Sequence, residues 1–167
     1  MNKSKKDEVN LYIVDSDVTF QNKIINTLKN NSNCTINLYN STKDFFYIFN
    51  STNNIQGKEL KVVLLASDLP DQEETFNAVK QIKRIDKDTE IILLTEKENM
   101  EYISEAFVNG VYGIIKKNEN ALYRIENSIN AIKSMKLFMK KKKSIKVIAW
   151  LFGILTVIMI LLYFFLK

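Results

Sequence analysis

Several short apolar runs in this chain end in polar side chains that could form one site together. In chain order these are Asp15 and Ser16, Asp68, Thr95 and Lys117, with Ala66 at an equivalent position. The chain has no histidine and one cysteine, Cys34, which argues against zinc sites, Cys/His proteases and Ser/His/Asp hydrolysis. Any metal site would have to be built from oxygen ligands, which suit hard cations such as Mg²⁺.

The elements that must position these residues repeat along the chain. Apolar runs of strand length occur at residues 11–14, 35–39, 61–66, 90–95 and 112–116. Between them, apolar residues recur every three or four positions, as at Phe20, Ile24 and Leu28, which is typical of amphipathic helices. Asp17, Ser41 and Asp71 are candidate helix caps. This alternation predicts an α/β fold with a doubly wound, five-stranded parallel sheet, and its functional crevice should lie at the carboxyl ends of the strands.

Length and charge limit the function further. The 167 residues suffice for one compact domain. Residues 1–135 hold 17 Lys and Arg against 19 Asp and Glu, whereas residues 136–167 hold seven Lys and no acid. The basic character therefore belongs to the tail, and we expect no nucleic-acid binding by the globular part.

Four motifs, VDSD, LLASDLP, IILLT and GVYGIIKK, stand in an order that resembles the receiver domain of bacterial response regulators. That family has an acidic cluster after the first strand, a phosphoacceptor Asp ending the third, a hydroxyl ending the fourth and a Lys ending the fifth. The resemblance covers about residues 9–135 and implies a flavodoxin-like (βα)5 fold. No Gly-rich phosphate loop of the P-loop or dinucleotide kind accompanies it.

The resemblance breaks at the residues that matter most for phosphorylation. Aligning Leu69-Pro70 with the family's Leu-Pro pair places Ala66 where the phosphoacceptor Asp stands, and a methyl group cannot be phosphorylated. Ser16 falls on the acid that usually coordinates Mg²⁺ directly, whereas Asp15 falls on the one that usually reaches the metal through water. We therefore expect a degenerate receiver that binds no metal and needs no cofactor.

The other site positions each have a structural interpretation. Asp15 is expected to be a structural acid neutralised by Lys117, and Lys116 is the alternative match to the family's Lys. Thr95 could simply end a buried strand. Asp68 lies on a loop two residues past the lost acceptor, where it is a candidate replacement phosphosite. Glu96 could pair with Lys117 and fill the phosphate pocket.

The tail predicts a membrane anchor. Residues 147–166 contain no charge and would span about 30 Å as a helix, enough for one crossing. The basic segment at 136–146 places four consecutive lysines, Lys140, Lys141, Lys142 and Lys143, before the span. These predict a cytoplasmic amino-terminal domain and contact with anionic lipid. Residues 1–8 lack the apolar stretch of a signal peptide and are expected to be disordered.

The expected function is a phosphorylation-independent pseudo-receiver, not an enzyme, held at a bacterial cytoplasmic membrane and acting through protein partners. An apolar stripe on the last helix continues past the domain to Met135 and Phe138, and family practice suggests that the fourth and fifth helices form the partner or homodimer face. Two alternatives stay open: a response regulator phosphorylated at a non-standard residue such as Asp68, and an enzyme that binds a nucleotide or flavin in the same crevice.

Overall fold

The computed structural model describes residues 9–29, 34–52, 60–67, 72–96 and 99–165. Within these ranges, the side chains at 52, 72, 140–149, 157, 160, 161 and 164 lie outside the description. So do several residues singled out by the sequence: the expected disordered segment 1–8, the cap Asp71, the candidate phosphosite Asp68, and the side chains of Lys140, Lys141, Lys142 and Lys143.

Five parallel strands form one sheet in the order β2-β1-β3-β4-β5. The strands are β1 (Val9–Val14), β2 (Cys34–Tyr39), β3 (Leu60–Ala66), β4 (Glu90–Thr95) and β5 (Gly113–Lys116). The helices are α1 (Val18–Leu28), α2 (Thr42–Thr52), α3 (Gln72–Ile85), α4 (Met100–Val108) and α5 (Ala121–Phe165). The prediction of alternating strands and helices around a five-stranded parallel sheet is thus confirmed, and every apolar run lies on a strand.

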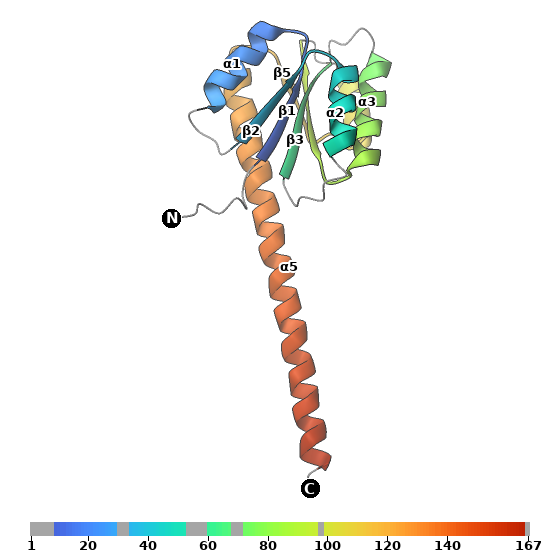
Figure 1. The fold of residues 1–167 in the computed structure, drawn as a ribbon, viewed down its shortest axis with the longest axis vertical. Coiled ribbons are helices and arrows are strands. Elements are labelled where there is room, and N and C mark those ends of the chain that lie inside the picture. The colour runs from blue at the N-terminus through green and yellow to red at the C-terminus, as the bar shows by residue number, and fades with distance from the viewer. Residues whose placement is uncertain (1–8, 30–33, 53–59, 68–71, 97–98, 166–167) are drawn as a thin grey trace. The chain divides into compact units, whose positions relative to one another are not determined.

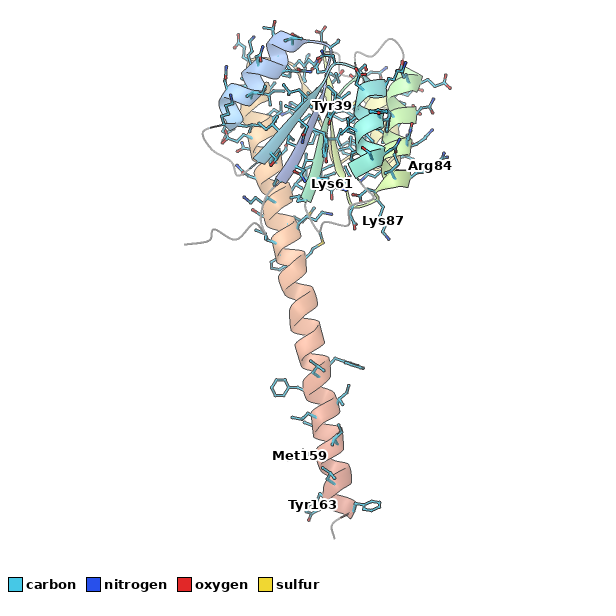
Figure 2. All side chains as sticks on the ribbon, viewed as in Figure 1. Tyr39, Lys61, Arg84, Lys87, Met159 and Tyr163 are labelled. Carbon is cyan, nitrogen blue, oxygen red and sulfur yellow. The ribbon has the colours of Figure 1, made fainter. Side chains whose placement is uncertain are left out.

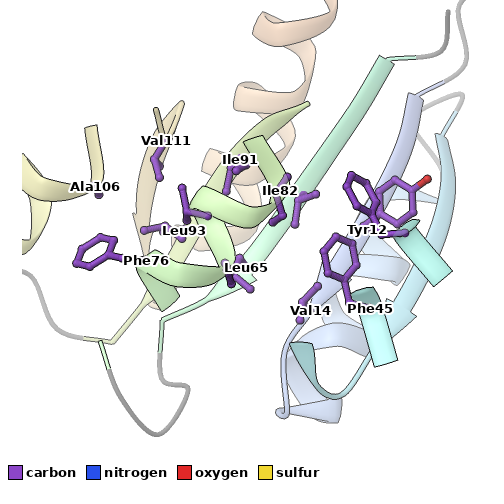
Figure 3. Close-up of a cluster of buried hydrophobic side chains, with 14 of the residues drawn as sticks. Tyr12, Val14, Phe45, Leu65, Phe76, Ile82, Ile91, Leu93, Ala106 and Val111 are labelled. Carbon is purple, nitrogen blue, oxygen red and sulfur yellow. The ribbon is translucent and has the colours of Figure 1, made fainter. Parts of the chain in front are cut away.

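Helices cover both faces of the sheet, with α1 on one side and α2 and α3 on the other (Figure 1). The strands are almost continuously apolar because both of their faces are buried; Leu64, Leu65, Ile92 and Leu93, from the central strands β3 and β4, are fully buried. On the side of α2 and α3, the buried side chains form one cluster that also includes Tyr102 and Ala106 of α4 (Figure 3).

Aromatic side chains dominate one end of this cluster, between β1, β2 and α2. The ring centroids of Tyr12 and Phe49 lie 5.4 Å apart with nearly perpendicular planes, and those of Phe45 and Phe49 lie 4.8 Å apart. Tyr39 packs against both Tyr12 and Phe45. Burial raises the pKa of Tyr39. Edge-to-face aromatic pairs stabilise a fold by about 0.5–1.5 kcal/mol per pair, beyond the stabilisation that comes from the apolar area they bury.

Two of the predicted helix caps are confirmed by hydrogen bonds. The carboxylate of Asp17 accepts from the backbone N–H of Phe20 at 3.0 Å, at the start of α1. The hydroxyl of Ser41 accepts from the N–H of Asp44 at 3.2 Å at the start of α2, and donates to that residue's carboxylate at 2.7 Å. Both helices therefore begin directly after the carboxyl ends of β1 and β2, where the crevice was expected.

The last helix belongs to two units of the chain, residues 1–130 and residues 131–167, and we describe each by itself. In the first unit, Ala121, Ile125 and Ile129 of α5 are buried, at the spacing of one helical face. In the second, Trp150, Leu151, Phe152, Leu155 and Met159 are more than half exposed. Within the part of the chain that is described, no helix combines the length and the apolar character needed to cross a membrane.

Candidate functional site

The site lies at the edge of the sheet where the parallel strands end. Asp15 follows β1, Ala66 ends β3, Thr95 ends β4 and Lys117 follows β5. Asp15, Ala66 and Thr95 are buried, and the side chain of Lys117 is largely so. The fold therefore brings these four residues to one edge, as the strand-end argument predicted. Asp68 lies outside the described residues.

Lys117 and Asp15 form an ion pair at this edge. The ammonium nitrogen of Lys117 lies 3.0 Å from Oδ2 of Asp15 and donates to Oδ1 at 3.3 Å. The side chains are 9% and 1% exposed, so water contributes little to holding either charge. Of the two lysines that the sequence left open, the structure thus pairs Lys117 with Asp15, and each charge is neutralised by the other.

Besides Lys117, a backbone N–H group also holds the Asp15 carboxylate in place. The N–H of Asp17 donates to Oδ1 of Asp15 at 2.9 Å, which ties the carboxylate to the turn that leads into α1. The N–H of Asp15 donates in turn to the carbonyl of Tyr39 at 3.0 Å, which joins the ends of β1 and β2. The carboxylate therefore accepts one backbone hydrogen bond and one charge-assisted hydrogen bond, which together fix its orientation.

Phe20 is a second neighbour of the lysine that sequence reasoning did not identify. The ammonium of Lys117 lies 5.5 Å from the centroid of the Phe20 ring, within the range of a cation–π contact. In the sequence, Phe20 belongs to the apolar repeat that predicted the first helix. Its half-buried ring contacts the charged group of the crevice, which a helical spacing alone cannot reveal.

Gln21 is another residue that the sequence analysis missed. Its side chain is buried, and its amide nitrogen donates to the carbonyl of Asp15, to the carbonyl of Tyr39 at 3.1 Å and to Oδ1 of Asn40 at 3.4 Å. One side chain thus holds the segments after β1 and β2 together. A signal was present: Gln21 shares a helical face with the apolar residues Ile24 and Leu28, and a polar residue on such a face requires partners.

Ala66 and Ser16 lie at the ends of the third and first strands, as the sequence predicted. Ala66 is the last residue of β3 and is 2% exposed, so only a methyl group faces the interior there. Ser16 is exposed in the turn after β1. Among the described residues, no group of three or more Asp, Glu, Cys or His side chains could hold a metal ion.

Thr95, the last residue of β4, and Glu96, which follows it, differ in their exposure to solvent. Thr95 is buried, and its carbonyl accepts the N–H of Lys117 at 2.7 Å, which holds β4 and the segment after β5 together. Glu96 is exposed. Lys117 is paired with Asp15, the acid after β1. This ion pair gives no support to the hypothesis that Glu96 pairs with Lys117 and fills the phosphate pocket.

The helices assigned to the predicted interaction face carry several exposed apolar side chains. On α4, Met100, Phe107 and Val108 are each at least half exposed, and so is Tyr123 on α5 in the first unit. In the second unit, Met135 and Phe138 of α5 are exposed as well. These side chains lie on the helices to which the sequence assigned the contact.

Known structures share this fold. A response regulator from Thermotoga maritima is 17% identical, with a TM-score of 0.60, covering 74% of this chain and 98% of that one. The chemotaxis protein CheY4 of Vibrio cholerae is 16% identical, with a TM-score of 0.60 and coverage of 75% and 98%. A putative pilus assembly-related protein from Burkholderia pseudomallei is 10% identical, with a TM-score of 0.61 and coverage of 80% and 96%. At these identities, the likeness shows the fold alone.

Comparison of the sequence itself gives the family. None of the curated protein sequences matches this chain significantly. The model of the response regulator receiver domain matches residues 11–130, which is most of the chain and nearly all of the first unit. The matched residues contain the whole of the carboxyl edge described above. This chain therefore belongs to the response regulator receiver family of two-component signalling.

Proposed function

We propose that this chain is a degenerate receiver, or pseudo-receiver, which does not work by phosphorylation and acts as a protein-interaction module in signalling. In this proposal it is not an enzyme. Its domain lies on the cytoplasmic side of a bacterial cytoplasmic membrane, to which a single span at residues 147–166 tethers it. The observation that carries the proposal is the side chain of Ala66.

A receiver requires a carboxylate at the end of its third strand, because the phosphoryl group is transferred to that oxygen. Ala66 ends β3 and offers a buried methyl group instead. Ser16 likewise removes a direct carboxylate ligand for Mg²⁺ from the turn after β1. With neither acceptor nor metal ligand, phosphorylation has no differential contact with which to shift the domain between two conformations.

The state of the lysine supports the same proposal. In a signalling receiver this residue would be needed to meet the charge of the phosphoryl group. Here the ammonium of Lys117 already has a buried partner in Asp15 at 3.0 Å and lies near the ring of Phe20. An incoming phosphate would have to compete with a carboxylate that is held in place by the backbone N–H of Asp17.

The candidate partner residues in this proposal lie on α4 and α5. In the first unit they are Met100, Phe107 and Val108 of α4 and Tyr123 of α5; in the second unit, Met135 and Phe138 of α5 form a separate candidate contact. Exposed apolar patches mark interaction sites more often than single exposed apolar residues do. The partner is either another protein of the pathway or a second copy of this chain.

The membrane part of the proposal is supported by the sequence. Residues 147–166 carry no charge, and the lysines at 140–143 and 146 precede them. Basic residues on this side of a span favour a cytoplasmic domain. The same lysines would contact anionic lipid headgroups, each adding about 1 kcal/mol of attraction near such a surface. Tethering in a plane also raises the effective concentration of neighbouring copies, so that a weak contact can be populated.

The decisive experiment exposes the purified full chain to a small-molecule phosphodonor with Mg²⁺ and measures its intact mass. We expect no added phosphate, whereas an Ala66→Asp, Ser16→Asp variant serves as the positive control. Stoichiometric phosphate on the unaltered chain would contradict the proposal. If that phosphate disappeared in an Asp68→Asn variant, the chain would instead be a response regulator phosphorylated at Asp68.

A further inference from the structure

The two edge strands of the sheet, β2 and β5, differ in how they are protected. β5 has four residues, and the guanidinium group of Arg124 in α5 donates to the carbonyl of Ile114 in this strand at 3.2 Å. Short length and charged side chains are two ways in which proteins keep an edge strand from pairing with another chain. β2 has six residues and lies at the opposite edge of the sheet (Figure 1). It is therefore the longer of the two edges that could accept another strand.

β2 has neither of these protections in its sequence. Residues 30–42, which contain the strand, include no charged residue and no proline. The strand is also poorly covered: none of its six residues is buried, whereas most residues of β1, β3 and β4 are. Leu38 is 43% exposed, and Ile36 is half-buried. Among the described residues, β1 is the one strand that pairs with β2. Its outer side is therefore a template for a further strand.

The orientation of α1 shows which side of this helix borders the edge. On one side, the side-chain amide of Gln21 donates to the carbonyl of Tyr39 at 3.1 Å, at the carboxyl end of β2 (Figure 2). On the other side, the ring of Phe20 lies near the ammonium of Lys117, which follows β5. The side of α1 that is turned away from Phe20 therefore lies along β2.

Val18 and Ile25 of α1, with its cap residue Lys29, belong to this side. They are separated by seven and four positions and so follow one helical face, on which Val18 is 53% exposed. Leu38 of β2 points to the same face of the sheet as α1, because the adjacent Tyr39 packs on the opposite face against α2. We call the outer side of β2, together with Val18, Ile25 and Leu38, the β2 edge.

The two ends of α1 carry opposite charges. Asp17 caps the start of the helix and Lys29 caps its end, and both are exposed. A two-fold axis perpendicular to the sheet would set the β2 strands of two copies antiparallel and keep both α1 helices on the same face. The basic end of each α1 would then lie beside the acidic end of the other. The β2 edge is thus complementary in charge to a second copy of itself.

We propose that the β2 edge pairs antiparallel with the β2 edge of a second copy, which joins the two sheets into one continuous sheet. Main-chain hydrogen bonds supply the contact, as in other cases of strand addition, and Val18 and Leu38 of both copies are covered. This inference goes beyond the proposed function and requires neither phosphorylation nor a membrane. The candidate partner residues on α4 and α5 take no part in the contact.

Crosslinking at the middle of β2 tests the pairing directly. Directly opposed residues of an antiparallel pair point to the same face, so the two-fold axis passes close to one residue near the middle of the strand. Asn37→Cys, in a Cys34→Ser background, therefore brings the new thiols of two copies close together. We expect a short bismaleimide to link the purified full chain, in mild detergent, into dimers. Gln81→Cys, at an exposed position of α3, should give none.

Matched variants test the contacts that hold the pair. Leu38→Lys places a charge on the edge strand and should prevent crosslinking at position 37. Lys29→Glu sets an acid beside Asp17 of the other copy, and because this contact occurs twice, the dissociation constant of the dimer should rise roughly tenfold. Lys23→Glu makes the same charge change on another exposed side of α1 and should have no effect. Adding Asp17→Asn to Lys29→Glu keeps the helix cap and should restore much of the affinity.

Sedimentation equilibrium measures these dissociation constants, and circular dichroism identifies variants that do not fold. If Leu38→Lys does not fold, the comparison of Lys29→Glu with Lys23→Glu decides. Absence of crosslinking at position 37, or equal effects of the two lysine substitutions, overturns the inference. Crosslinking at position 37 that is lost in Phe107→Glu but retained in a folded Leu38→Lys variant also overturns it, because the copies would then meet through α4.

Discussion

Lys117 and Asp15 are paired across strands that are not neighbours. Lys117 follows β5 and Asp15 follows β1, and β3 and β4 lie between them in the sheet. Their ion pair at 3.0 Å therefore closes the carboxyl edge over its central strands. It also links the turn before α5 to the first strand, so that the crevice of this receiver is held together by residues of the chain itself.

Breaking this pair should cost stability. Because both side chains are buried, removing one partner leaves the other charge without compensation, and we expect Lys117→Met or Asp15→Asn to destabilise the domain by about 3–5 kcal/mol. The double variant should recover a large part of that loss. Urea denaturation followed by circular dichroism measures the three values, and Lys116→Met is the matched control. Strictly additive losses would show that the two groups do not interact.

Gln21 should prove more important than an ordinary helix residue. Replacing it with Met keeps its size but leaves the carbonyls of Asp15 and Tyr39 without the amide donor, at a cost of about 1–3 kcal/mol for buried polar groups. Asn22→Met, at the exposed neighbour in α1, should change the stability little. Thermal unfolding compares the two variants, and equal melting temperatures would contradict the role assigned to Gln21.

The Lys61–Asp86 pair should make stability depend on pH in the acid range. Burial raises the pKa of Asp86, but the hydrogen bonds from Lys61, from the N–H of Asp88 and from Thr89, together with the charge of Lys61, lower it by more, so the net pKa is below its usual value. A lowered folded-state pKa stabilises the domain above the unfolded value and loses that contribution as the pH falls through the folded one. The advantage of the unaltered chain over Asp86→Asn should therefore be present at neutral pH and shrink below about pH 4. A difference in unfolding free energy between the two proteins that does not change with pH would contradict the role assigned to the Lys61–Asp86 pair.

If the proposed function is right, adding acids at Ala66 and Ser16 should create a Mg²⁺ site. Ala66→Asp with Ser16→Asp introduces two carboxylates into the crevice, so Mg²⁺ should raise the melting temperature of the double variant and leave the unaltered chain unchanged. A ligand at about 100 times its Kd stabilises by about 2.7 kcal/mol. Ala66→Asp alone is the control, because it buries a carboxylate without its companion ligand. Stabilisation of the unaltered chain by Mg²⁺ would show that the crevice still binds metal.

The apolar residues of α4 and α5 should control association. Phe107→Glu and Phe138→Glu should each weaken crosslinking of the full chain to its partner or to a second copy, because a charge would have to be buried in the contact. Tyr47→Glu, at an exposed aromatic residue of α2, serves as the control. If Asp15→Asn instead abolished association in a folded domain, the crevice would be the interaction site.

The fold could be predicted from the sequence because its strands and helices have different periods. Val62 to Leu65 form an uninterrupted apolar run that suits a strand buried on both faces, and Ile24 and Leu28 fit one face of a helix. The crevice followed from topology, since carboxyl ends of parallel strands share an edge. Asp15, Ala66, Thr95 and Lys117 could therefore be expected to meet before any coordinate was known.

The finer contacts could not be predicted in the same way. The choice between Lys116 and Lys117 depends on which side chain the short strand β5 turns toward Asp15, and one position along a strand reverses that direction. The contact of Phe20 with the ammonium depends on ring orientation, and the partners of Gln21 lie as far as 19 positions away in the chain. Periodicity identifies a face of an element and not the atoms that meet there.

The two units of the chain carry different aromatic residues, and each unit therefore has its own spectroscopic signal. In the first unit the signal comes from the aromatic cluster between β1, β2 and α2. It holds tyrosines and phenylalanines in rigid contact, so the near-ultraviolet circular dichroism of Tyr12 and Tyr39 reports on packing within residues 1–130. The only tryptophan of the chain, Trp150, lies in the second unit. Its fluorescence therefore reports on the surroundings of the tail. Recorded together during one titration with denaturant or detergent, the two signals distinguish melting of the receiver from transfer of the tail between water and lipid.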